Sequence, residues 1–263
     1  KYGYRCEIHR VYTEDRYILE MHRVPHGKNQ TPGPRPVVFL QHGLLSSSAE
    51  WVLMTPGKGL AYILADKGYD VWMGNARGNT YSRRHSVLKP ESKAFWQFSW
   101  HEIGYYDLPA MIDYVIKETG VVKLQYVGFS QGTTVFWVMA STRPEYNDKI
   151  IAMQALAPIA YLYKSGKFAN FNHGWINNLR RYGSFKPPEY NLKNIRAPIF
   201  LHYSDNDWLS TPDDVYRLSN EIKTVIGQFR VPMAKFNHLD FVFAINATEL
   251  IYNRLLKIMD NFK

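Results

Sequence analysis

Short apolar runs alternate with amphipathic stretches along most of the chain. The runs are rich in β-branched and aromatic residues, which favour strands, whereas the stretches between them repeat their apolar residues at helical spacing. Strands are expected over residues 36–40, 69–73, 123–127, 150–157, 198–202 and 228–231, and helices over residues 60–67, 101–119, 131 onward, 212–223 and 247–262. Such alternation predicts an α/β fold, in which a mostly parallel central sheet has helices on both faces.

Two stretches depart from this alternation. Residues 7–13 and 17–24 are expected to form an opening hairpin ahead of the first parallel strand. Residues 163–198 are rich in Asn, Gly, Pro and aromatic side chains and show no clean period. We therefore interpret this second stretch as a candidate cap or lid.

The pentapeptide Gly128-Phe129-Ser130-Gln131-Gly132 lies between a predicted strand and the helix that follows it. A serine at such a sharp turn is held above the sheet, where its hydroxyl group can attack a carbonyl carbon. Glycines are needed two residues before and after it, because a Cβ atom there would strike the neighbouring backbone. The pentapeptide alone is compatible with ordinary loop composition, but its context favours the nucleophile elbow of an α/β-hydrolase fold.

A serine nucleophile needs a histidine that accepts its proton and a carboxylate that orients the histidine. In this fold the order along the chain is serine, acid, histidine. After Ser130 come His173 in the irregular segment, His202 within a strand-like run, and His238 in the loop after the last strand. An isolated histidine is more often structural, but the position of His238 favours a catalytic role.

The acid is expected in the loop after the strand over residues 198–202. Asp205 and Asp207 both lie there, and their spacing does not decide between them. A role in stabilising the turn is the alternative for either residue. Asp213 and Asp214 follow a helix start and are better explained as first-turn residues that complement the helix dipole.

Ester hydrolysis places negative charge on the carbonyl oxygen, which backbone N–H groups must face. One donor is expected from Gln131, the residue after the nucleophile, and the other from Leu44 in the loop after the third strand. His42-Gly43, just before Leu44, is equally compatible with a simple tight turn.

Composition narrows the function classes further. With 263 residues and 46% hydrophobic positions, the chain can form one large domain with a single core. The formal charge of +9 could attract a lipid surface or nucleic acid, but the basic residues are dispersed and no nucleic-acid motif accompanies them. A mean hydropathy of −0.34 and the lack of a long apolar run argue against a membrane span.

Processing and modification leave weaker traces. Residues 1–4 lack the hydrophobic stretch of a signal peptide, so the chain is expected to be a processed or trimmed product. Cys6 is the single cysteine, which rules out a disulfide within the chain. Asn29 and Asn246 each begin a glycosylation sequon, which would matter if the protein is secreted.

Several longer motifs are more specific. They are His42-Gly43-Leu44-Leu45, Asn75-Ala76-Arg77-Gly78-Asn79-Thr80-Tyr81-Ser82-Arg83-Arg84-His85, Tyr106-Asp107-Leu108-Pro109-Ala110 and His238-Leu239-Asp240-Phe241. These motifs resemble the acid lipase family of gastric and lysosomal lipases. The similarity extends from Thr13-Glu14-Asp15 to the last helix. It implies a secreted or lysosomal enzyme that hydrolyses neutral-lipid esters without a metal or other cofactor, with transient contact to a lipid interface. The family triad falls on Ser130, Asp207 and His238, so the resemblance favours Asp207 over Asp205.

The chain also departs from the family pattern. Phe129 stands where the family usually has histidine, and Arg16 where it usually has glycine. Between Tyr163 and Lys164 the family carries an extensive cap with its disulfide, whereas this chain passes directly to residues that resemble the end of the cap. The expected division is therefore an N-terminal core part (1–163), a residual cap or lid segment (164–197) and a C-terminal core part (198–263).

A shortened cap would leave the serine more open, reduce selectivity for long acyl chains and weaken interfacial activation. Hydrolysis of neutral-lipid esters is the leading hypothesis. A carboxylesterase for short soluble esters is the alternative within enzymes, and a lipid-binding relative without turnover is the alternative outside them. Enzymes that use aspartate at the elbow are disfavoured because position 130 is serine. The oligomeric state is not predicted.

Overall fold

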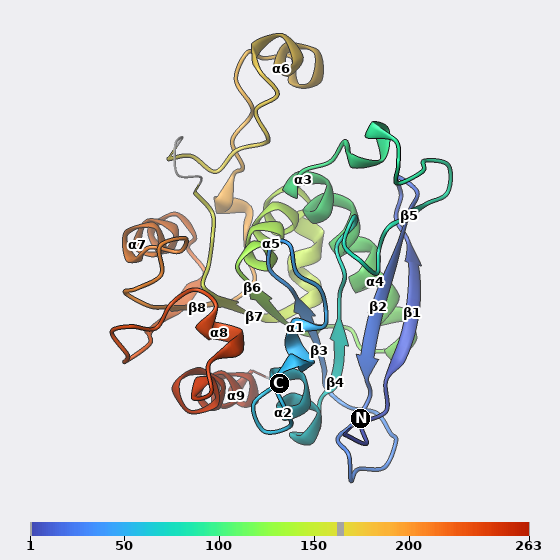
Figure 1. Cartoon of the computed structure of the whole chain (residues 1–263). Coiled ribbons are helices and arrows are strands. Elements are labelled where there is room, and N and C mark those ends of the chain that lie inside the picture. The colour runs from blue at the N-terminus through green and yellow to red at the C-terminus, as the bar shows by residue number, and fades with distance from the viewer. Residues whose placement is uncertain (1, 162–165, 263) are drawn as a thin grey trace.

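The computed structural model describes residues 2–161 and 166–262, which form a central sheet with helices packed against it (Figure 1). The strands are β1 (Glu7–Tyr12), β2 (Tyr17–Val24), β3 (Val37–Gln41), β4 (Asp70–Met73), β5 (Arg84–His85), β6 (Leu124–Phe129), β7 (Ile150–Leu156), β8 (Ile199–Tyr203) and β9 (Val225–Arg230). The α-helices are α1 (Glu50–Leu53), α2 (Leu60–Asp66), α3 (Trp100–Glu102), α4 (Leu108–Thr119), α5 (Gln131–Thr142), α6 (Trp175–Tyr182), α7 (Pro212–Glu221), α8 (Asp240–Phe243) and α9 (Asn253–Asn261). Shorter 3₁₀ segments (Lys93–Trp96, Pro144–Lys149, Leu192–Asn194) and π-helical turns (Ile103–Asp107, Thr248–Tyr252) connect them.

The sheet has the strand order β1-β2-β4-β3-β6-β7-β8-β9, and β5 pairs with β2 at one end. Six neighbouring strands run parallel, namely β4, β3, β6, β7, β8 and β9. Strands β1 and β2 join this sheet by antiparallel pairing. Both the opening hairpin and the parallel sheet predicted from the hydrophobic pattern are confirmed. In a parallel sheet the carboxyl ends of the strands meet at one edge, so the loops after β3, β4, β6 and β8 come together there.

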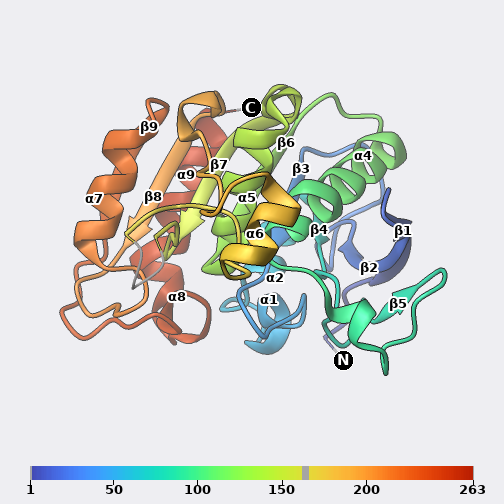
Figure 2. The same cartoon turned by 90° about the horizontal axis from the view of Figure 1, so that it is seen from above.

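Helices cover both faces of the sheet (Figure 2). On β3, Val37 and Phe39 join the apolar layer that includes α4, α5 and α7, whereas Val38 and Leu40 join the layer that includes α2, α8 and α9. Successive strand side chains point to opposite faces, so a strand buried on both faces is mostly apolar. This explains why the central strands appear in the sequence as largely apolar runs, in which the polar exceptions include the buried Gln125, Gln154 and His202.

The segment predicted to be irregular holds a helix that the sequence pattern did not predict. Figure 1 shows α6 at the end of an arm that projects away from the sheet. Gly174 (φ 84°) precedes α6 and Gly183 (φ 66°) ends it, both in the left-handed region that glycine adopts readily. Its eight residues are too few to display a clear helical period. The domain boundary predicted between residues 163 and 164 lies outside the described residues.

Smaller differences concern where elements begin. The helix predicted over residues 101–119 consists of α3, a π-helical turn and α4, and the last predicted helix also opens with a π-helical turn. Strand β9 begins at Val225, three residues before the predicted start. Among the described residues, no helix has both the length and the apolar character that crossing a bilayer requires.

Candidate active site

Ser130 occupies a strained turn between β6 and α5. Its φ of 54° and ψ of −119° are unusual for a residue with a side chain. A Cβ atom on Gly128 would lie 2.7 Å from the Gly132 carbonyl oxygen, and one on Gly132 would lie 2.2 Å from the Gln41 carbonyl oxygen. Both glycines are therefore required by close backbone contacts, as the sequence predicted.

The side chains of Ser130, His238 and Asp207 form a continuous hydrogen-bonded row. His238 Nε2 is 2.8 Å from Ser130 Oγ, and His238 Nδ1 is 2.7 Å from Asp207 Oδ2. The other carboxylate oxygen of Asp207 accepts bonds from the N–H groups of Leu209 and Ser210, each 2.9 Å long. The buried carboxylate is thus held on both sides and aligns the imidazole ring with the serine hydroxyl.

The remaining candidate acid and histidines lie elsewhere. Asp205 pairs with Arg230 at the surface. His202 is a buried β8 residue that bonds to Gln154, and burial together with a nearby arginine lowers its pKa to about 3. His173 lies just before α6 and is 3.0 Å from an Arg181 nitrogen. The structure thus brings His238 and Asp207 to the serine and leaves the other candidates in separate surroundings.

The two backbone donors expected to face the oxyanion lie beside one pocket. Leu44 and Gln131 both line a pocket of about 340 Å³, together with Trp96, Phe98, Trp100 and Phe171. Across the part of the chain that the structure describes, neither backbone N–H donates a hydrogen bond. A free N–H beside a pocket with several aromatic side chains can bind the oxygen of an ester whose acyl or alcohol group occupies that pocket.

The chain is similar in sequence to known lipases. Residues 36–187 match the family profile described as alpha/beta hydrolase fold, and residues 1–55 match that of a partial alpha/beta-hydrolase lipase region. Lipase 1 of Drosophila melanogaster is 38% identical, and the match covers 98% of this chain and 78% of the relative. The chain belongs to the acid lipase family of α/β hydrolases.

A gastric lipase is also similar in sequence to this chain, and a more distant esterase shares its fold. Gastric triacylglycerol lipase of Bos taurus is 34% identical, over 98% of this chain and 89% of the relative. The alignment with Lipase 1 runs over 347 positions whereas this chain has 263 residues, so that relative carries residues with no counterpart here. An esterase of Pyrococcus furiosus, at 16% identity, shares the fold with a TM-score of 0.66, over 98% of this chain and 92% of that structure.

Three separate acid lipase motifs meet in one buried ion cluster. The Arg77 guanidinium group contacts Asp107 at 2.6 Å and Asp15 at 2.5 Å, and the Arg77 N–H donates to Asp107 at 2.9 Å. Arg77 and Asp107 are buried, and the guanidinium carbon lies 4.0 Å from the centre of the Tyr17 ring. The cluster ties the loop after β4 to the first hairpin and to the start of α4. In the sequence these residues stand out only as a family signature, and no local pattern indicates their role.

The departures from the acid lipase pattern have local explanations. Arg16 has φ 73°, so the glycine usual in the family suits this turn better than a residue with a side chain. Phe129 packs on the triad, with its ring centre 5.0 Å from that of His238.

The two asparagines that begin glycosylation sequons differ in exposure. Asn29 is exposed, whereas Asn246 is half-buried and contacts Met233.

His42 supports the loop that is expected to form the oxyanion hole, and the sequence did not reveal this contact. Its Nδ1 donates to the Gly43 carbonyl oxygen at 2.7 Å, and its Nε2 accepts from the Ala76 N–H at 3.1 Å and from the Asn79 side chain at 3.2 Å. Complete burial lowers the pKa of His42 to about 4, so the ring is neutral at ordinary pH, with one donor and one acceptor. One clue in the sequence was Asn79. It follows β4, the strand that pairs with β3, so a polar partner for His42 could be expected there.

Proposed function

We propose that this acid lipase family member is a serine ester hydrolase that cleaves the acyl esters of neutral lipids. The observation that carries the proposal is the position of His238, within hydrogen-bond distance of both Ser130 and Asp207. The relatives named as lipases support a lipid ester as the substrate class. No metal or other cofactor takes part in the proposed reaction.

In the acylation step, His238 Nε2 accepts the proton of the Ser130 hydroxyl group as its oxygen attacks the ester carbonyl carbon. The electron pair of the carbonyl bond moves to the oxygen, which faces the N–H groups of Leu44 and Gln131. Asp207 stabilises the imidazolium ion that forms. Collapse of the intermediate expels the alcohol, which takes its proton from His238 and leaves an acyl group on Ser130.

In the deacylation step, water attacks the acyl-enzyme while His238 accepts a proton from it. The second tetrahedral intermediate faces the same two N–H groups, and its collapse releases the fatty acid and returns the proton to the Ser130 oxygen. Removing one oxyanion donor from an enzyme of this type costs about 3 to 4 kcal/mol of transition-state stabilisation. Both steps therefore depend on how firmly the Leu44 peptide is held.

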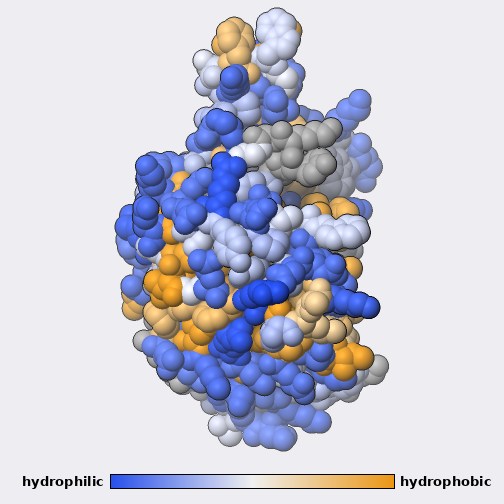
Figure 3. Space-filling view, turned by 90° about the vertical axis from the view of Figure 1, so that its left-hand side faces the viewer, coloured by the Kyte–Doolittle hydropathy of each residue, from blue (hydrophilic) through white to orange (hydrophobic). Residues whose placement is uncertain are grey.

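The arm that carries α6 (residues 171–185) supports transient contact with a lipid interface. Its exposed apolar side chains are Phe171, Trp175, Ile176, Leu179 and Phe185. Arg180 and Arg181 lie on the same helix, and Figure 3 shows the arm as a narrow projection on which hydrophobic and hydrophilic side chains lie side by side. A short helix with apolar and basic side chains suits the boundary between the headgroups and acyl chains of an anionic lipid surface.

Covalent labelling tests the proposed nucleophile. A fluorophosphonate is expected to add to Ser130 Oγ with loss of fluoride, and mass spectrometry of the peptide that contains Ser130 measures the adduct. Prior heat denaturation should abolish the reaction, because the free hydroxyl of serine is a poor nucleophile. A folded protein that remains unlabelled would instead favour a lipid-binding relative without turnover.

Substrate dependence separates a lipase from an esterase for short soluble esters. Because the resemblance to the family implies that the cap is shortened in this chain, we expect only a shallow rise in rate when a triacylglycerol passes from dissolved monomers to an emulsion. Rates on emulsified tributyrin and triolein, measured on either side of the solubility limit, test this expectation. A steep jump at the limit would contradict it, and activity confined to dissolved short-chain esters would favour the carboxylesterase alternative.

We also propose, from the family resemblance, that the protein works in a secreted or lysosomal setting. Glycosylation is then expected at Asn29, which lies on an exposed turn, and less readily at Asn246, which is half-buried. The dispersed positive charge argues against nucleic acid as a partner.

A further inference from the structure

Gly43 is the point at which the oxyanion loop approaches the nucleophile. A Cβ atom at this position would lie 3.1 Å from the Phe129 ring and 3.3 Å from Ser130 Cβ, so a glycine fits the space best. Glycine also has the freest backbone of all residues. The peptide that presents the Leu44 N–H therefore begins at the residue that restrains it least, and its direction must be set by outside contacts.

Two buried side chains supply these contacts. His42 Nδ1 donates to the Gly43 carbonyl oxygen at 2.7 Å. The Gly43 N–H donates to the Glu50 carboxyl group, at 3.2 Å from Oε1 and 3.5 Å from Oε2. Glu50 is the first residue of α1 and is only 3% exposed, and within residues 2–161 and 166–262 no cationic side chain pairs with it.

We propose that Glu50 is a positioning residue of the oxyanion hole, which fixes the direction of the Leu44 N–H by holding the N–H of Gly43. The Gly43 carbonyl group and the Leu44 N–H belong to one planar trans peptide and point in opposite directions. His42 holds that peptide, and Glu50 holds the preceding one, so together they restrain both backbone dihedrals of Gly43. This inference rests on the proposed function, because it assigns Glu50 a role in the same reaction.

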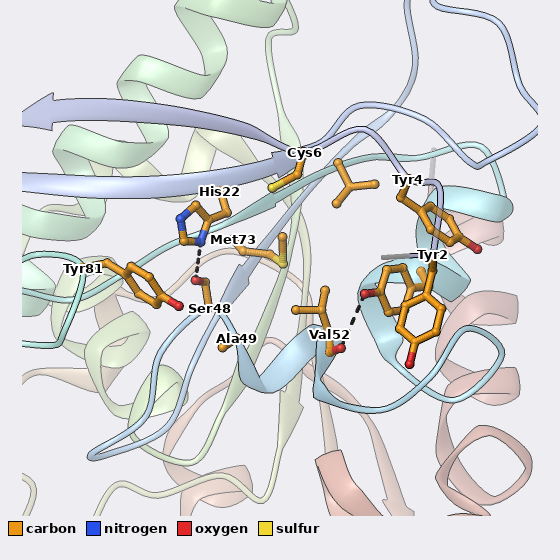
Figure 4. Close-up of a pocket in the computed structure, with 11 residues that line it drawn as sticks. Tyr2, Tyr4, Cys6, His22, Ser48, Ala49, Val52, Met73 and Tyr81 are labelled. Atoms are coloured by element: carbon orange, nitrogen blue, oxygen red, sulfur yellow. Dashed lines mark hydrogen bonds between the residues drawn. The ribbon is translucent and has the colours of Figure 1, made fainter.

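Glu50 can act as a fixed point because the loop before it is anchored. Figure 4 shows Ser48 pointing toward His22 of β2, and their Oγ and Nδ1 atoms are 2.7 Å apart. The Ser48 N–H also donates to Asn75 Oδ1 at 2.9 Å, and Asn75 Nδ2 donates to Ser48 Oγ at 3.0 Å. These hydrogen bonds hold the loop in place, and Glu50 follows the fully buried Ser48 by two residues.

Burial raises the pKa of Glu50 to about 8, although contacts with Ser46 and with the Gly43 backbone oppose the rise. The titratable group that faces it from the C-terminal layer is Tyr252, and Ser46 contacts it from its own loop. The carboxyl group is thus neutral in acidic and neutral solution, where it still accepts from Gly43. Its folded pKa exceeds its unfolded value, so stability is full at low pH and is lost as the pH rises from about 4.5 toward 8.

The test compares Glu50→Leu, which removes the acceptor, with Glu50→Gln, which keeps a carbonyl oxygen in place. For a soluble ester, we expect kcat to fall about 10- to 100-fold in Glu50→Leu, with KM within about twofold and most of kcat recovered in Glu50→Gln. Leu255→Ala in α9 is the control, because it destabilises the same buried layer without touching Gly43. The proposal is overturned if Glu50→Leu keeps its kcat or if Leu255→Ala loses as much.

A second measurement does not depend on turnover. Hydrogen exchange of the Gly43 amide, followed by NMR in the Ser130→Ala background, should be faster in Glu50→Leu than in Glu50→Gln or in the parent. Equal protection in all three proteins would refute the role of Glu50 even if the protein hydrolyses esters. If the protein does not hydrolyse esters, the exchange rate of the Gly43 amide still tests whether Glu50 holds the Gly43 N–H. If Glu50→Leu does not fold, Glu50→Ala, which also removes the acceptor, takes its place in both measurements. Parent-like kcat or parent-like protection of the Gly43 amide in Glu50→Ala would count against the proposal.

Discussion

Replacing Ser130 with alanine is expected to lower kcat for a soluble ester by about 10⁴- to 10⁶-fold, with little change in the unfolding temperature. The serine oxygen forms the bond to the acyl group, and alanine leaves His238 with no hydroxyl group to deprotonate. Initial rates with an activated aryl ester, together with thermal unfolding, measure both effects. Residual rates of this size remain because the N–H groups of Leu44 and Gln131 still bind the oxyanion when water attacks.

Asp205→Asn is the matched control for the triad. Asp205 lies two residues from Asp207 but pairs with Arg230 at the surface, so its substitution should leave kcat near the parent value. Asp207→Asn should lower kcat steeply, because the buried carboxylate holds the imidazole tautomer. A Ser130→Ala variant with substantial activity, or equal losses at the two aspartates, would disprove the assignment.

Replacing Arg77 with methionine is expected to reduce the free energy of unfolding by about 3 to 5 kcal/mol. The substitution leaves the carboxylates of Asp107 and Asp15 without their shared cation, and Asp107 is completely buried. For a domain of this size the unfolding temperature should fall by roughly 10 °C. Denaturant unfolding and calorimetry measure the change.

The loss in Arg77→Met should also depend on pH. Burial already raises the pKa of Asp107 above its usual value, although Arg77 opposes the rise, so removing the guanidinium group should raise this pKa further and favour the protonated form. Stability is then lost as the pH rises, so the destabilisation should be smaller near pH 5 than near pH 8. Arg230→Met is the control, because its partner Asp205 is exposed and this substitution should hardly change stability. Equal effects of the two substitutions would contradict a structural role for the buried cluster.

Elements with a strong local pattern were predictable from the sequence. The central parallel strands are mostly apolar because both of their faces are buried, and the elbow requires glycines at two fixed positions. The helix α6 was missed because its apolar positions span barely two turns within a segment that otherwise shows no period. The π-helical turns were also missed, since they shift the helical register without changing the composition.

The kind of fold, the place of the serine and the order of its partners could be predicted from the residues alone, because these depend on local periodicity and on steric limits at a turn. Spacing could not choose between Asp205 and Asp207, and the resemblance to a family was needed to favour one. Tertiary structure decided which side chains meet. Arg77 joins Asp15 and Asp107 from distant parts of the chain, and Glu50 is an ordinary acidic first-turn residue until packing buries it beside Gly43. Contacts between residues so far apart, or burial of an ionisable side chain, leave no local pattern from which they could be predicted.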